Sequence, residues 1–122
     1  MIIVDTDIFI DFLRGMKYAY EFLNKNSKEI AFSALTETEL LAGKECDDTK
    51  KREDILHLLS EFEKIPIGNP LAQVAGDLRR KNDIKIPDAI IAASALQEDA
   101  LLVTRNAKDF EKIKELKVKK PY

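Results

Sequence analysis

The sequence predicts an α/β fold in which a central parallel β-sheet is covered on both faces by helices. Short apolar runs at 2–4, 29–33 and 101–104 are typical of buried strands. Between them, apolar residues recur at spacings of three and four, which indicates amphipathic helices. Alternating strands and helices form βαβ units, whose binding sites lie outside the carboxyl ends of the strands. A chain of 122 residues suits one core, so we expect a single domain over residues 1–122.

The first half of the chain begins with a strand that turns directly into a helix. The strand Ile2–Val4 is stopped by Asp5-Thr6-Asp7, and a helix is expected from Ile8 to Leu13, ending at Gly15. We assign the capping of this helix to Asp7. The elements expected next are a helix over Tyr18–Leu23, a strand over 29–33, a helix from about Leu35 to Ala42 closed by Gly43, and a mobile connection or helix start over Glu45–Asp54.

In the second half, the spacing of apolar residues predicts further helices around one short strand. Pro87 is expected near the start of a helix whose apolar residues cover almost its whole circumference, so that helix should be buried. The elements expected in this half are a helix over 55–62, a short strand or turn over 65–68, a helix over 71–78, a helix over 87–95, a strand over 101–104, and a last helix or turn over 110–116.

Composition excludes several classes of protein. The single cysteine, Cys46, excludes an internal disulfide, and together with the single histidine, His57, it cannot supply the ligands of a structural zinc site. No run approaches the roughly 18 apolar residues of a membrane span, and the first acid comes too soon for a signal peptide, so we expect a cytoplasmic protein without membrane contact. The net charge is −2, but residues 105–122 carry a local surplus of +4, which either helps to hold a nucleic-acid backbone or is a solvated surface that keeps the protein soluble.

Four acidic residues stand where strands or helices would deliver them to a common cleft: Asp5, Glu39, Asp88 and Asp109. Unit charges about 4 Å apart repel by roughly 4 kcal/mol at an effective dielectric constant near 20, so such a cluster needs protons or a cation. Hard oxygen ligands suit Mg²⁺, which also leaves positions open for phosphate and water. The pattern therefore predicts a divalent-metal site.

Each acid also has a purely structural alternative. Glu39 can be the third position of a capping box that starts at Thr36. Asp88 lies in a first helical turn, where the helix dipole favours any acid. Asp109 lies among charged neighbours, as at a solvated helix start, and Asn106 can occupy the site in its place. Asp5 has the weakest alternative, because a carboxylate directly after a buried strand needs a partner.

The chain resembles the PIN-domain nucleases, and within them the VapC-type toxins of prokaryotic toxin–antitoxin pairs. Four segments carry the resemblance in the order typical of that family, and they span nearly the whole chain: Ile3–Asp11, with Asp7 where asparagine is also common; Ser33–Gly43, with its acid at Glu39; Pro87–Ala95, with Asp88; and Leu102–Phe110, with Asn106 or Asp109 as its last polar group.

The resemblance implies a three-layer α/β/α PIN-like fold with a central parallel sheet, homodimerisation and metal-dependent endoribonuclease activity on RNA. It also implies inhibition by a cognate antitoxin. Asp5 and Asp88 would be direct ligands of Mg²⁺ or Mn²⁺, and Glu39 and Asp109 would complete the catalytic site directly or through waters. Three polar residues are expected to orient these ligands or to position substrate: Thr6, Thr104 and Asn106. His57 is expected to be structural or at the surface.

Three other functions are alternatives to this one. Val4–Asp7 superficially resembles the haloacid-dehalogenase signature of phosphatases that form an aspartyl-phosphate, but Phe9 stands where that signature needs a small hydroxyl residue. A phospho-receiver module would need an acceptor aspartate after a central strand, whereas the middle of this chain offers helical Ile55–Leu58. A PIN-like binding subunit without catalysis is disfavoured because all four candidate acids are present.

Overall fold

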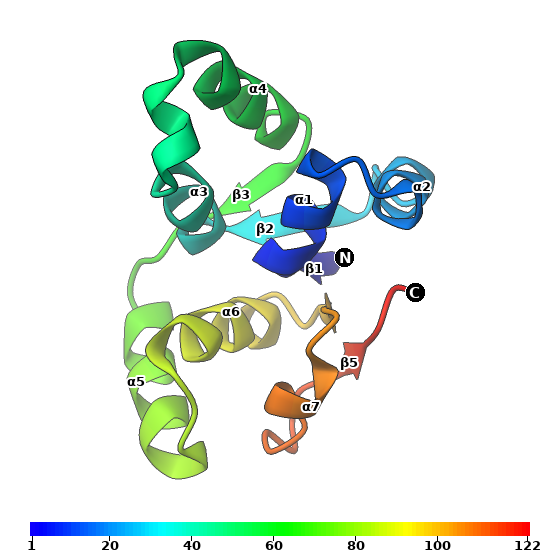
Figure 1. Ribbon diagram of the computed structural model, residues 1–122. Coiled ribbons are helices and arrows are strands. Elements are labelled where there is room, and N and C mark those ends of the chain that lie inside the picture. Colours follow the sequence, from blue (N-terminus) through cyan, green and yellow to red (C-terminus); the bar gives the residue numbers. More distant parts are fainter.

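The structure, a computed structural model, describes residues 1–122 and confirms the predicted three-layer α/β/α architecture (Figure 1). Its centre is a parallel five-stranded sheet with the strand order β3-β2-β1-β4-β5. The chain first builds outward from β1 through β2 to β3, and then returns to place β4 on the other side of β1. The strands are β1 Ile2–Val4, β2 Ile30–Ser33, β3 Glu63–Ile65, β4 Leu101–Val103 and β5 Val118–Lys119.

Helices cover both faces of the sheet. In Figure 1, α1, α2 and α4 lie above the sheet, whereas α5, α6 and α7 lie below it. None of these helices is long and apolar enough to span a membrane. The helices are α1 Thr6–Leu13, α2 Lys17–Lys25, α3 Ala34–Leu41, the 3-10 helix η1 Lys44–Asp47, α4 Thr49–Leu59, α5 Leu71–Asn82, α6 Ile86–Gln97 and the short α7 Ala107–Phe110.

The hydrophobic core has two layers because successive strand residues point to opposite faces of the sheet. Val4 belongs to the layer under α1 and α4, where Phe9 and Phe32 meet edge-on with ring centroids 5.9 Å apart. Ile3 belongs to the other layer, against α6, whose alanines let the helix approach the sheet closely. Full burial of each phenylalanine contributes about 1.5–3 kcal/mol to folding. As predicted, α6 is buried around most of its circumference.

The pairing of β1 with β4 determines what lies at the carboxyl edge of the sheet. Val4 is in register with Val103, and the backbone N–H of Asp5 donates to the Val103 carbonyl at 2.9 Å. The ladder therefore continues one residue beyond the strand, and Asp5 and Thr104 leave the sheet side by side. Thr104 is also held from β5, because its N–H donates to the Lys119 carbonyl at 3.1 Å.

The structure corrects one prediction about a helix start and excludes one alternative. The residue that caps α1 is Asp5, not Asp7: its side chain accepts the Thr6 N–H at 2.8 Å, and the helix starts at Thr6. Asp7 lies inside the first turn instead. Thr36 does not open a capping box for Glu39 either, because Ser33 caps α3 by accepting the Leu35 N–H at 3.1 Å.

Other elements differ in extent from the predictions. The charged connection after Gly43 is ordered as η1 and α4, and α4 begins where the Asp48 side chain accepts the Lys50 N–H at 2.9 Å. Strand β3 ends at Ile65, where the segment 65–68 had been expected to form a strand or turn. Strand β5 was not predicted, because Val118 is its single apolar residue and gives no periodicity.

The C-terminal tail is tied to α1 through a buried carboxylate. Asp11 is 1% exposed; it accepts two hydrogen bonds from Arg105 Nη1, at 2.6 and 2.7 Å, and one from Tyr122 Oη at 2.7 Å. Burial opposes ionisation of Asp11, but the hydrogen bonds from Arg105 and Tyr122 outweigh it and lower the pKa of the carboxyl. The interaction joins α1, the loop after β4 and the tail after β5.

We predict that Tyr122→Phe lowers the free energy of unfolding by about 1–3 kcal/mol, because it removes a hydrogen bond to a charged, buried acceptor. Urea unfolding followed by circular dichroism measures this. The matched control is Tyr20→Phe, whose hydroxyl makes no hydrogen bond to protein and whose ring is 57% exposed; its effect should stay within about 0.5 kcal/mol. Equal effects of the two substitutions would show that the contact with Asp11 adds nothing to stability.

Candidate functional site

The candidate site lies at the carboxyl edge of the sheet, at the point where the strand order reverses. Strand β1 pairs with β2 on one side and with β4 on the other, and this position is where open α/β sheets typically bind ligands. Asp5 and Thr104 meet at this edge, where the Thr104 hydroxyl donates to Asp5 Oδ2 at 2.8 Å. Thr104 was expected to orient the ligands or to position substrate, and it is hydrogen-bonded to Asp5 in the structure.

Asp5 is a buried carboxylate in an unfavourable electrostatic environment. It is 8% exposed. Burial raises its pKa to about 7, the negative charge of Asp7 adds to the shift, and hydrogen bonds from Thr104 and Thr6 reduce it. Near neutral pH the group is thus divided between its protonated and ionised forms. A bound cation would favour the ionised form.

Asp7 is a site residue that the sequence analysis missed. Its Oδ2 accepts the Arg105 N–H at 3.0 Å and lies 3.3 Å from the Thr104 hydroxyl, whereas its Oδ1 is buried and has no hydrogen-bond partner. Burial raises the pKa of Asp7, and the Arg105 N–H opposes that shift. The spacing Asp5-Thr6-Asp7 could have revealed this role, because the capping residue and the second residue of the helix both lie at the carboxyl end of the strand.

Thr6 connects α1 to Glu39. Its hydroxyl donates to Glu39 Oε1 at 2.6 Å and lies 2.9 Å from the hydroxyl of the buried Thr36. Glu39 itself is exposed, so its second carboxylate oxygen is open to solvent or to a ligand. The predicted orienting role of Thr6 thus has a defined geometry: it fixes one oxygen of Glu39 beside the start of α1.

Asp88 and Asp109 approach the site from the opposite layer. Asp88 is half-buried in the first turn of α6; burial raises its pKa, with Asp109, Glu39 and Asp7 adding to the shift and Lys85 opposing it. The fields of three other acids therefore act on this one carboxylate. All four predicted acids belong to one electrostatic cluster.

Asn106 and Asp109 lie in contact with each other. The Asn106 side-chain amide donates to Asp109 Oδ2, and its backbone N–H donates to the Thr104 hydroxyl at 3.0 Å. The two alternatives for the fourth position therefore share one location, with Asn106 between Thr104 and Asp109. His57, in contrast, is exposed on α4 and belongs to none of these contacts.

The donor chemistry of the cluster fits a hydrated divalent cation. No three Asp, Glu, His or Cys side chains converge closely enough to enclose a metal ion by themselves. Mg²⁺ is usually held by one or two carboxylates and retains several waters, so it does not need a closed protein cage. The buried, unpaired Oδ1 of Asp7 and the raised pKa of Asp5 both indicate a missing positive charge or donor at this edge.

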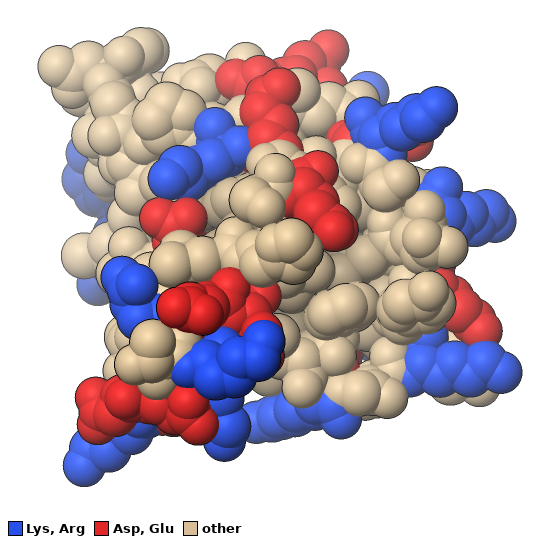
Figure 2. Space-filling view, turned by 90° about the horizontal axis from the view of Figure 1, so that it is seen from above, with Lys and Arg blue, Asp and Glu red and all other residues tan.

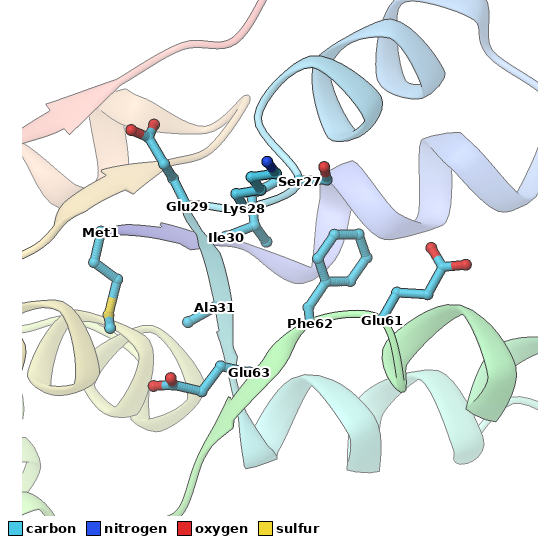
Figure 3. A pocket seen from close by; sticks show the side chains of 9 residues that line it. All are labelled: Met1, Ser27, Lys28, Glu29, Ile30, Ala31, Glu61, Phe62 and Glu63. Carbon is cyan, nitrogen blue, oxygen red and sulfur yellow. The ribbon is translucent and has the colours of Figure 1, made fainter.

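The largest cavity lies elsewhere. It has a volume of about 700 Å³ and is lined by residues at the amino-terminal ends of β1, β2 and β3, at the edge of the sheet opposite Asp5. Its acidic side chains point in different directions: in Figure 3, Glu29, Glu61 and Glu63 diverge from one another. These three carboxylates therefore do not form a cluster like the one at the carboxyl edge.

Charge is mixed over the surface of the molecule. On the face shown in Figure 2, Lys and Arg side chains are interspersed with Asp and Glu, so neither sign covers it. This agrees with the small net charge of −2. Binding of a polyanion would therefore depend on local groups of basic residues and not on the field of the whole protein.

Comparison with known proteins agrees with the fold and with the family that the sequence resembles. The chain is 34% identical to Ribonuclease VapC10 of Mycobacterium tuberculosis over 124 residues, covering 96% of this chain and 91% of the relative. It is also 34% identical to Ribonuclease VapC19 of the same organism over 122 residues, covering 90% of this chain and 92% of the relative.

Solved structures give the same result. A chain of a toxin–antitoxin complex from Klebsiella pneumoniae superposes with a TM-score of 0.86 at 32% identity, covering 100% of this chain and 98% of that one. A chain of VapBC2 from Rickettsia felis, solved bound to a promoter DNA fragment, gives a TM-score of 0.79 at 26% identity, with 98% of each chain covered.

The PIN domain family model matches residues 2–116. The family predicted from the sequence is confirmed: this chain belongs to the PIN-domain family.

Proposed function

We propose that this protein is an endoribonuclease of the VapC type, the toxin of a toxin–antitoxin pair, and that it hydrolyses RNA phosphodiester bonds with Mg²⁺ or Mn²⁺. The observation that carries the proposal is the buried Asp5 at the switch point of the sheet, within one electrostatic cluster with Asp7, Asp88 and their acidic neighbours. Relatives named as ribonucleases support the reaction class. The full chain, residues 1–122, would act as one PIN domain.

In this proposal, Asp5 and Asp88 hold the cation directly, while Glu39 and Asp109 complete the site directly or through waters. A bound divalent cation lowers the pKa of a coordinated water and stabilises negative charge on the attacked phosphate. Asp7 has an unpaired, buried Oδ1 beside these acids, and this oxygen would need a water or the cation as its partner.

The hydroxyl and amide groups of the site would orient its carboxylates. Thr104 has one hydroxyl proton, which it can donate to Asp5 or to Asp7 but not to both at once. Donation to Asp5 Oδ2 at 2.8 Å, the shorter contact, would fix that oxygen and turn the carboxylate as a ligand. Thr6 would hold Glu39 in the same manner, and Asn106 would hold Asp109. The proposed hydrolysis would not require a covalent nucleophile from the protein.

The proposal extends to partners and location. Solved relatives include a toxin–antitoxin complex and VapBC2 bound to promoter DNA, and we propose a cognate antitoxin for this protein on that basis. Homodimerisation and a cytoplasmic location stay predictions. A binding subunit without catalysis is the alternative, and the experiment below distinguishes it.

We predict that Asp5→Asn lowers RNA cleavage by about 100-fold or more, because it removes a charged ligand of the cation. Purified protein is incubated with structured RNAs and Mn²⁺ or Mg²⁺, and products are resolved on denaturing gels with EDTA as a parallel sample. The matched control is Asp99→Asn, an exposed aspartate at the turn before β4 with a positive φ that asparagine tolerates. Full activity of Asp5→Asn, or cleavage that survives EDTA, would contradict the proposed metal role.

We also predict a pH-dependent effect of the same substitution on metal-free stability. The folded-state pKa of Asp5, about 7, lies above its value of 3.8 in the unfolded chain, so the folded state binds the extra proton between these values. The fold therefore loses stability as pH rises from about 3.8 to about 7, and Asp5 causes no further loss above that pH. Relative to wild type, Asp5→Asn should be more stabilising at pH 8 than at pH 5, as measured by urea unfolding in EDTA. A difference that does not change with pH would show that Asp5 is not destabilised by burial.

A further inference from the structure

A groove runs along the sheet between α2 and the segment that follows β5. Its volume is about 340 Å³, and its floor is formed by apolar side chains of β1 and β4. One wall is α2 and the other is the tail; Figure 1 shows the C-terminal end of the chain approaching α2. None of the roles assigned to the four acids involves this groove.

Two tyrosines stack where the walls meet. Tyr18 of α2 and Tyr122 of the tail have ring centroids 6.0 Å apart and an interplanar angle of 29°. Tyr18 is nevertheless 63% exposed and Tyr122 is 39% exposed. The pair therefore presents aromatic surface to the solvent that a flat, polarisable group can cover.

The charge of the groove is positive, in contrast to that of the whole chain. Lys25, Lys119 and Lys120 line it, and none of the three forms a salt bridge. The single acid in the lining, Glu21, lies 3.8 Å from Lys17. A basic groove with exposed aromatic side chains is the combination that binds single-stranded nucleic acids, since lysines contact the phosphates and rings stack on the bases.

The groove is connected to the carboxylate cluster. The Tyr122 hydroxyl donates to Asp11, Asp11 accepts Arg105 Nη1, and the Arg105 N–H donates to Asp7. Tyr122, at one wall of the groove, is therefore linked to Asp7 of the candidate site through Asp11 and Arg105.

We propose that this groove binds a single-stranded segment of the RNA substrate, with one base on the Tyr18–Tyr122 pair and its phosphates beside Lys25, Lys119 and Lys120. The proposal rests on the ribonuclease function proposed above and adds the path of the strand. A second copy of this chain is a poorer occupant, because a two-fold contact would bring the lysines of both copies together.

The test is the binding of a fluorescein-labelled oligouridine of about 12 nucleotides, a length within the range of single-strand sites. Fluorescence anisotropy is measured in EDTA, so that binding is read without cleavage. Tyr18→Ala should weaken binding about tenfold, the loss expected for one stacked base, and Tyr18→Phe should restore it. The matched control is Tyr20→Ala: Tyr20 is similarly exposed but stacks on Phe12 outside the groove.

The lysines are tested by salt dependence. The double substitution Lys119→Ala and Lys120→Ala should reduce the slope of log affinity against log salt by about 1.4, the value for two lost phosphate contacts on a single strand. Lys112→Ala with Lys114→Ala is the control, because these residues belong to the same basic segment but line a different cavity.

Equal affinity of the Tyr18→Ala and Tyr20→Ala proteins would overturn the proposal, as would equal salt slopes of the two double variants. A change of oligomeric state on sedimentation in Tyr18→Ala alone would also overturn it, because the groove would then be a contact between copies. These results are independent of the nuclease proposal, which is decided by cleavage in the Asp5→Asn protein. If the protein did not cleave RNA, the comparison of binding in EDTA would still test the groove.

Discussion

The pairing of β1 with β4 is the constraint on which the candidate site depends. The two strands are far apart in the sequence, and their register places the end of one against the end of the other. The hydrogen bond from the Asp5 N–H to Val103 extends the ladder, and the Thr104 hydroxyl then reaches the Asp5 carboxylate. A shift of one strand by one residue would turn its side chains to the opposite face, and Asp5 and Thr104 would no longer meet. The site is therefore a consequence of strand pairing, not of the loops alone.

The fold places acids together at an electrostatic cost. Burial and neighbouring charges raise the pKa values of Asp5, Asp7 and Asp88, so each resists ionisation in the absence of a counter-charge. Asp11 has the opposite environment: it is more deeply buried than Asp5, but Arg105 and Tyr122 satisfy it and lower its pKa. Asp11 is therefore a structural carboxylate with its partners within the protein, whereas Asp5, Asp7 and Asp88 lack a counter-charge. Carboxylates whose pKa values are raised in this way are typical of functional sites.

The parallel sheet and most helices could be predicted from the sequence because their apolar periodicity is strong. The grouping of the four acids could be predicted because parallel strands share a carboxyl edge. Sequence reasoning failed where long-range contacts or the geometry of a single turn decide the outcome. Whether Asp5 or Asp7 caps α1 depends on the side-chain geometry at a single turn. The two-residue strand β5 exists because β4 offers it a partner. The contact of Tyr122 with Asp11 joins residues 111 positions apart, and no local pattern predicts it.

The central claim is that the carboxyl edge of β1 and β4 holds a divalent cation through Asp5 and its neighbours. The most direct test is anomalous diffraction from crystals grown with Mn²⁺ at a pH above 7, where Asp5 is mostly ionised. The claim predicts an anomalous peak about 2.1 Å from a carboxylate oxygen of Asp5, with Asp88 on the same ion. Absence of a peak at this edge, or a peak at the opposite edge beside Glu29 and Glu61, would contradict it.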